Sequence, residues 1–138
     1  MLSGIDSGRI LFASGPDSQE HVQAYQQCDI MLDPFPHTGG VSSMEQIYMG
    51  VPIITRYGKN IAGRLTASLL TVIGREEWIA AGIPEYVSKA VALSKDIPQI
   101  EAARKSLRKE FVRSTAISEY VWRVEEAYVE MWKEKVFS

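Results

Sequence analysis

Hydrophobic and polar positions in the first 56 residues follow an order typical of strands joined by helices. Three short apolar runs, residues 9–14, 29–32 and 51–56, have the length of buried strands. Apolar residues at helical spacing separate the first two runs, and a helix over residues 41–49, ended by Gly50, separates the last two. This alternation predicts a parallel sheet with helical crossovers.

The remainder of the chain is predicted to be helical. The spacing predicts helices over about residues 60–73, 75–81, 84–95 and 98–114, and a last helix that contains residues 120–132. The last helix carries an apolar stripe, made of Tyr120, Val121, Val124, Ala127, Tyr128, Met131 and Trp132. We expect Trp78, Trp122 and Trp132 to pack in cores. The whole chain, 1–138, is interpreted as one partial domain, with strand and helix alternation over 9–56 and a helical section over 60–136.

Composition narrows the class of protein. The chain of 138 residues is 46% hydrophobic and 23% charged, which is typical of a soluble globular domain. Its net charge of −2 gives no reason to expect nucleic acid or an anionic membrane as a partner. We find neither a membrane-spanning apolar stretch nor a signal peptide. Cys28 is the single cysteine, which excludes an internal disulfide and favours a reducing, cytoplasmic location.

The candidate chemistry lies between the second strand and the helix that follows it. Gly39 and Gly40 allow a bound group to approach the backbone closely, and Ser42 and Ser43 are positioned to cap the helix or to bind a phosphate oxygen. Unpaired N–H groups at a helix start favour an anion. Glu45, one turn on, is suited to accept hydrogen bonds from sugar hydroxyls. A plain strand-to-helix turn would have the same residues, and the pattern alone leaves both interpretations open.

Other polar residues give weaker signals. His37 is interpreted as a solvent-exposed loop residue that faces the proposed pocket, and Arg64 as a contact of either a ligand or a structural carboxylate. Cys28 is interpreted as a small buried thiol, because no base is placed to activate it. Two histidines and one cysteine at unrelated spacings predict no metal site.

A family resemblance rests on two segments. Residues 29–55 are DIMLDPFPHTGGVSSMEQIYMGVPIIT, and residues 61–70 are IAGRLTASLL. From about residue 9 to residue 135 the chain resembles the C-terminal part of O-linked N-acetylglucosamine transferases, above all bacterial members fused to tetratricopeptide repeats. The resemblance implies an α/β fold, in which a Rossmann-like parallel sheet with flanking helices forms part of the C-terminal nucleotide-binding domain of a GT-B glycosyltransferase.

The resemblance also implies a site for a UDP-sugar. The positions that it assigns to this donor are Pro16, His21, Gly39, Gly40, Val41, Ser42 and Glu45. In this assignment the helix start faces the diphosphate, Glu45 meets the ribose hydroxyls, His21 lies near the uracil, and the turn at Pro16 contacts the base. No metal or other cofactor is expected, since backbone donors, the helix dipole and basic side chains neutralise the leaving UDP.

Three departures from the family pattern limit the expected function. Gly40, Val41 and Ser42 replace the usual His-Thr-Thr, and Ser18 replaces a lysine beside the base. The family's essential lysine belongs upstream of this chain, so we assign it no catalytic residue. We expect a UDP-binding part of a glycosyltransferase for protein Ser or Thr, inactive alone, with the acceptor bound by other domains. The alternative is a non-catalytic nucleotide- or protein-binding module. Apolar surfaces exposed without neighbouring domains would favour self-association.

Overall fold

A three-stranded parallel sheet with flanking helices forms the centre of the molecule. The computed structural model describes residues 4–12, 23–114 and 117–137. The sheet contains β1 (Met31–Leu32), β2 (Ile53–Arg56) and β3 (Ile79–Ala80), in that order. Met31 pairs with Ile53, and Thr55 pairs with Ile79. The expected fold class, an α/β parallel sheet with flanking helices and a helical C-terminal section, is confirmed.

Helices make up most of the described chain. The α-helices of the described residues include α2 (Val41–Tyr48), α3 (Leu65–Val72), α4 (Ile83–Ser94), α5 (Ile97–Ser114) and α6 (Ile117–Phe137). Short 3-10 helices lie at η1 (Ser7–Arg9), η2 (Ile61–Gly63) and η3 (Glu76–Trp78). Residues 23–26 are also helical. The predicted helices over residues 41–49, 84–95 and 98–114 are confirmed to within a few residues. The predicted helix over 60–73 is divided, because η2 precedes α3.

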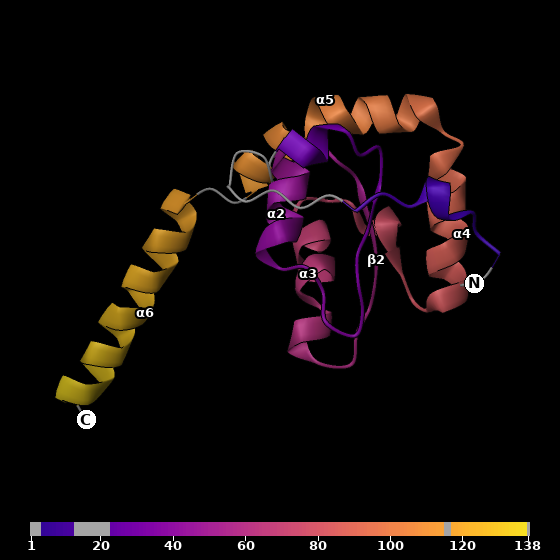
Figure 1. Ribbon diagram of the computed structural model, residues 1–138. Coiled ribbons are helices and arrows are strands. Elements are labelled where there is room, and N and C mark those ends of the chain that lie inside the picture. The colour runs from indigo at the N-terminus through magenta and orange to yellow at the C-terminus, as the bar shows by residue number, and fades with distance from the viewer. Residues whose placement is uncertain (1–3, 13–22, 115–116, 138) are drawn as a thin grey trace.

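The helices cover β2 on both sides. Figure 1 shows α2 and α3 on one side of β2 and α4 on the other, with α5 crossing one end of the layers. Ile53 and Ile54 point to opposite faces of the sheet, and both are almost completely buried. Each such side chain contributes about 1.5–3 kcal/mol of hydrophobic stabilisation. Burial on both faces explains why Ile53 and its neighbour Ile54 are both apolar, where a strand with one solvated face would alternate apolar and polar residues.

Two predicted elements were wrong. Residues 9–14 do not form a strand in their described part, since Arg9 belongs to η1 and Phe12 is 98% exposed. The third strand is instead β3, which lies within the predicted helix over residues 75–81. A two-residue strand is too short to show periodicity, and its pairing with β2 is a tertiary contact that the local sequence does not encode.

The last helix, α6, projects away from the sheet and its covering helices (Figure 1). Its Trp122 and Trp132 are 55% and 61% exposed, so the expectation that they pack in a core was wrong for this chain. Trp78, by contrast, is buried as expected. Within the described residues, no helix has both the length and the apolar character needed to span a bilayer.

Candidate functional site

The loop between β1 and α2 is anchored by the carboxylate of Asp33, which is 5% exposed. One carboxylate oxygen accepts a hydrogen bond from the Gly39 N–H at 3.0 Å, and the other accepts from the Thr55 hydroxyl at 2.6 Å. The buried Tyr86 hydroxyl donates to the Asp33 carbonyl at 3.0 Å. Burial raises the pKa of Tyr86, and the charge of Asp33 raises it further. Asp33 therefore fixes the loop to the sheet.

A second anchor holds the loop against η2. The Thr38 hydroxyl and the Thr38 N–H both donate to the carbonyl of Ala62, at 2.8 and 3.1 Å. With its side chain and backbone paired to the same oxygen, buried Thr38 cannot turn toward a ligand. The loop enters α2 as a rigid segment, held at one end by the sheet and at the other by η2.

The start of α2 depends on two glycines. Gly40 is the N-cap, with φ +57° and ψ −113°, a backbone conformation that is essentially restricted to glycine. A Cβ at Gly39 would lie 2.5 Å from the Ser43 hydroxyl oxygen, so the turn has no room for a side chain. No side chain of the described residues caps α2. Its first backbone N–H groups therefore have no intrahelical partner and point out of the helix end.

The two serines have separate roles. The Ser42 hydroxyl donates to the Gly39 carbonyl at 2.7 Å, which leaves its lone pairs free to accept but commits its proton. The Ser43 hydroxyl is buried and lies 2.9 Å from the Thr66 hydroxyl of α3. The proposed cap or phosphate contact at Ser43 was therefore wrong, because its hydroxyl joins α2 to α3.

Glu45 lies one turn into α2 and is half-buried. The Tyr25 hydroxyl donates to Glu45 Oε2 at 3.3 Å. Burial raises the pKa of Tyr25, and the adjacent Glu45 carboxylate raises it further, so the phenol stays protonated and remains a donor. Tyr25 thus orients the carboxylate that the family resemblance assigns to the ribose.

The remaining candidates are placed as follows. His37 is exposed as expected, and its Nδ1 lies 2.8 Å from the Thr38 carbonyl, where Nδ1–H donates. Arg64 donates from Nε to the Gly58 carbonyl at 2.9 Å, which is a structural contact. Cys28 is half-buried and donates weakly to the Ala24 carbonyl. Pro16 and His21 lie outside the described residues.

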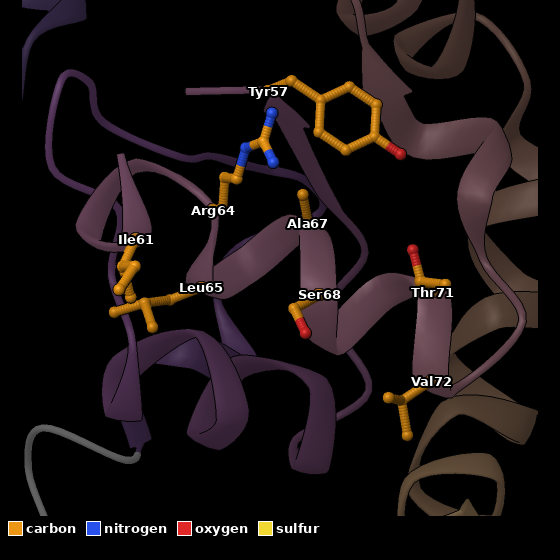
Figure 2. A pocket seen from close by; sticks show the side chains of 8 residues that line it. All are labelled: Tyr57, Ile61, Arg64, Leu65, Ala67, Ser68, Thr71 and Val72. Atoms are coloured by element: carbon orange, nitrogen blue, oxygen red, sulfur yellow. The ribbon is translucent and has the colours of Figure 1, made fainter. Parts of the chain in front are cut away.

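Two shallow pockets lie along α3, beside the start of α2. One, of about 450 Å³, is bordered by Gly40 and Val41, and the other, of about 460 Å³, is bordered by Tyr57. Leu65, Ser68 and Val72 of α3 line both. The second pocket appears in Figure 2, with Leu65 toward one end and Val72 toward the other. The pocket that Gly40 and Val41 border is largely apolar and adjoins the uncapped helix start.

Sequence reasoning missed the residues that support the loop. Asp33, Thr38, Thr55 and Tyr86 were not among the candidates, although they hold the start of α2 in place. An acid directly after an apolar run was the only signal in the sequence. The others become recognisable only once β1, β2 and α4 are packed together.

With this geometry established, comparison with known proteins identifies the family. The family model described as glycosyl transferase family 41 matches residues 1–123. The chain belongs to glycosyl transferase family 41. This confirms the resemblance to O-linked N-acetylglucosamine transferases.

Curated relatives of this family 41 chain support the assignment. It is 38% identical over 117 residues to a probable UDP-N-acetylglucosamine–peptide N-acetylglucosaminyltransferase SPINDLY from Hordeum vulgare, covering 83% of the chain and 12% of the relative. It is 30% identical over 132 residues to the UDP-N-acetylglucosamine–peptide N-acetylglucosaminyltransferase of Caenorhabditis elegans, covering 94% of the chain and 12% of the relative. The chain thus spans about an eighth of the length of these proteins.

A solved structure of a related protein matches the same region. The family 41 chain superimposes on an O-GlcNAc transferase mutant from Thermobaculum terrenum with a TM-score of 0.78 and 30% sequence identity. The match covers 86% of this chain and 23% of that structure. The sequence comparison and the structure comparison therefore both match the chain to one part of larger transferases.

Proposed function

We propose that the first turn of α2 binds the diphosphate of a UDP-sugar, and that the chain is the donor-binding part of a glycosyltransferase. In this proposal the complete enzyme transfers N-acetylglucosamine or a related sugar to Ser or Thr of a protein acceptor. Membership of family 41 supports it, as do the names of the relatives, which describe UDP-N-acetylglucosamine–peptide N-acetylglucosaminyltransferases.

The uncapped start of α2 is the observation that carries the proposal. The backbone N–H groups of Gly40, Val41 and Ser42 belong to the helix end that the dipole makes positive. Gly39 and Gly40 present no side chain that would keep a phosphate away from these donors. Asp33 and Thr38 hold the loop in this geometry before any ligand arrives, which lowers the entropy cost of binding.

Glu45 supplies the second recognition element. Its carboxylate lies one turn beyond the diphosphate position, where it would accept hydrogen bonds from the ribose hydroxyls. We also keep Pro16 and His21 as proposed contacts of the uracil. The described residues contain no cluster of three or more His, Cys, Asp or Glu side chains suited to a metal ion. We propose that backbone donors of the α2 start bind the diphosphate.

We propose that the chain by itself binds the nucleotide without transferring the sugar. It corresponds to 12% of the length of the relatives named above, so most of their structure lies in other segments. The acceptor protein would be held by those segments. A non-catalytic nucleotide- or protein-binding module is the alternative, and the replacement of His-Thr-Thr by Gly40, Val41 and Ser42 is the observation that favours it.

Calorimetric titration with UDP tests the proposal. We expect Glu45→Gln to weaken binding by about 1–3 kcal/mol, the usual value of hydrogen bonds to a charged group. Tyr25→Phe removes the 3.3 Å hydrogen bond that orients Glu45 but keeps the carboxylate, so we expect it to weaken UDP binding less than Glu45→Gln does. Equal binding by wild type and Glu45→Gln would place the nucleotide elsewhere. No binding of UDP by the wild-type chain would favour the protein-binding module.

A further inference from the structure

A separate pocket lies where β2 ends, at the edge of the sheet where α/β proteins bind ligands. It has a volume of about 280 Å³ and is lined by Phe35 and Pro36 of the β1–α2 loop and by Arg56, Lys59 and Gly63. None of these residues belongs to the proposed donor site. The pocket therefore needs an explanation of its own.

Aromatic contacts hold Arg56, the last residue of β2, in place. Its guanidinium carbon lies 4.3 Å from the centre of the Phe35 ring, a cation–π contact. The Phe35 ring packs against the edge of the Tyr86 ring, with ring centres 5.8 Å apart. Tyr86 is itself fixed by its hydrogen bond to the carbonyl of Asp33. The position of the Arg56 side chain is thus set by packing.

The charge of Arg56 is not neutralised within the described residues. No carboxylate there forms an ion pair with Arg56 or Lys59. The Arg56 Nε is buried, and no group of the described chain accepts its hydrogen bond. Arg75 differs from Arg56 in this respect, because its guanidinium forms an ion pair with the carboxylate of Glu110 at 2.6 Å. A buried N–H without an acceptor is costly, and an incoming anion would remove that cost.

The backbone around the pocket is closely packed. A Cβ at Gly63 would lie 2.9 Å from the Pro36 carbonyl oxygen, and one at Gly58 would lie 2.5 Å from the Gly63 carbonyl oxygen. Arg56 and Lys59 bring two positive charges to the lining of this pocket. Carboxylates and phosphates are the groups that match an arginine fork of this kind.

We propose that this pocket is a second anion-binding site, in which Arg56 and Lys59 hold a carboxylate or phosphate group. Arg56 donates through its buried Nε–H, with Phe35 holding the guanidinium in position. Lys59 adds charge at the entrance. This site differs from the proposed diphosphate position, where backbone N–H groups and no side-chain cations would bind the ligand.

NMR spectroscopy of the arginine side chains tests the proposal directly. The Nε–H signal of Arg56 in the ¹⁵N-labelled chain is assigned by through-bond correlation to its backbone. It is then followed during separate titrations with inorganic phosphate and with acetate, at constant ionic strength. We expect a saturating shift of the Arg56 signal with at least one of the two probes, and the probe that saturates identifies the class of anion. Linear shifts with both probes, equal to those of the exposed Arg113, would overturn the proposal.

Variants provide the second readout. Lys59→Met is expected to lower the apparent affinity for the saturating anion several-fold. It should not unfold the chain, because Lys59 is exposed. Arg113→Met is the matched control and should leave the titration unchanged. Glu45→Gln, which tests the nucleotide site, should also leave it unchanged, so failure of one site is distinguishable from failure of the other. Saturation of the Arg56 Nε–H signal with the same apparent affinity in Lys59→Met as in the wild type would overturn the assignment of Lys59 to the site.

Discussion

The Thr55 hydroxyl of β2 donates a 2.6 Å hydrogen bond to the carboxylate of Asp33, directly after β1. Both residues are buried, so the interaction joins two neighbouring strands inside the protein. The second carboxylate oxygen accepts from the Gly39 N–H and thereby extends the connection to the start of α2. A contact within the sheet thus determines the geometry of the candidate ligand site.

The first prediction concerns this carboxylate. We expect Asp33→Ala to lower the free energy of unfolding by about 2–4 kcal/mol, since it leaves the buried Thr55 hydroxyl and the Gly39 N–H without their acceptor. Thr55→Val, which removes only one of the two hydrogen bonds, should cost about 1–2 kcal/mol. Urea unfolding followed by circular dichroism measures both. A cost for Asp33→Ala no larger than that for Thr55→Val would contradict the double role of the carboxylate.

The second prediction concerns the backbone at the helix start. Gly40→Ala should destabilise the fold by about 1–3 kcal/mol, because φ +57° with ψ −113° is a strained conformation for alanine. It should also weaken UDP binding, since the N–H groups of α2 would be displaced. Gly74→Ala is the control, as Gly74 has φ +75° in open space and lies in the turn after α3. We expect that variant to be somewhat less stable and to bind UDP normally, as measured by thermal unfolding and calorimetry.

The third prediction is a dependence on pH. Burial acts to raise the pKa of Glu110, but hydrogen bonds from Arg75 and Ser106 outweigh it, and the net pKa lies below the ordinary value of 4.5. The ion pair therefore stabilises the fold above pH 4.5, and its contribution is lost as the pH falls through the lowered pKa of the folded state. Glu110→Gln should lower the free energy of unfolding by about 1 kcal/mol at pH 7. The effect is this small because the ion pair is partly exposed to solvent.

Urea unfolding at a series of pH values checks this. The difference in unfolding free energy between wild type and Glu110→Gln should narrow as the pH falls below about 4.5, the ordinary value for a glutamate carboxyl. Glu101→Gln on the exposed face of α5 is the control and should differ little from wild type at any pH. A difference that stays constant down to pH 3 would show that the charge of Glu110 is not the stabilising feature.

The fourth prediction concerns α6. Its exposed apolar stripe includes Tyr128 and Met131, at 67% and 63% exposure, on a helix that projects from the rest of the chain (Figure 1). We expect the isolated chain to self-associate as its concentration rises, because association would bury this surface. Sedimentation velocity measures the effect. Met131→Glu should shift the distribution toward monomer, whereas Lys133→Glu, which changes charge without removing apolar surface, should not.

The sequence by itself determined several of the longer helices and indicated the loop that holds the candidate site. Glycine and proline at their ends, and apolar residues at helical spacing, are local signals, so α2, α4 and α5 were predicted to within a few residues. The Gly39–Gly40 pair after an apolar run and an acid likewise indicated a strand, a tight turn and a helix start, although the sequence did not show that this start lacks a side-chain cap. The family was recognisable from the same residues, because their order along the chain carries it.

Only the tertiary structure decided which segments form the sheet and which side chains hold the site. β3 is two residues long, and its strand character comes from pairing with β2, a contact between residues more than twenty positions apart. Ser43 was interpreted as a cap or a phosphate contact, yet its hydroxyl lies beside that of Thr66, because α3 packs against α2 at that point. Asp33 and Thr55 become partners only when β1 and β2 lie side by side. Such contacts depend on the packing of distant segments, which local patterns of residues do not encode.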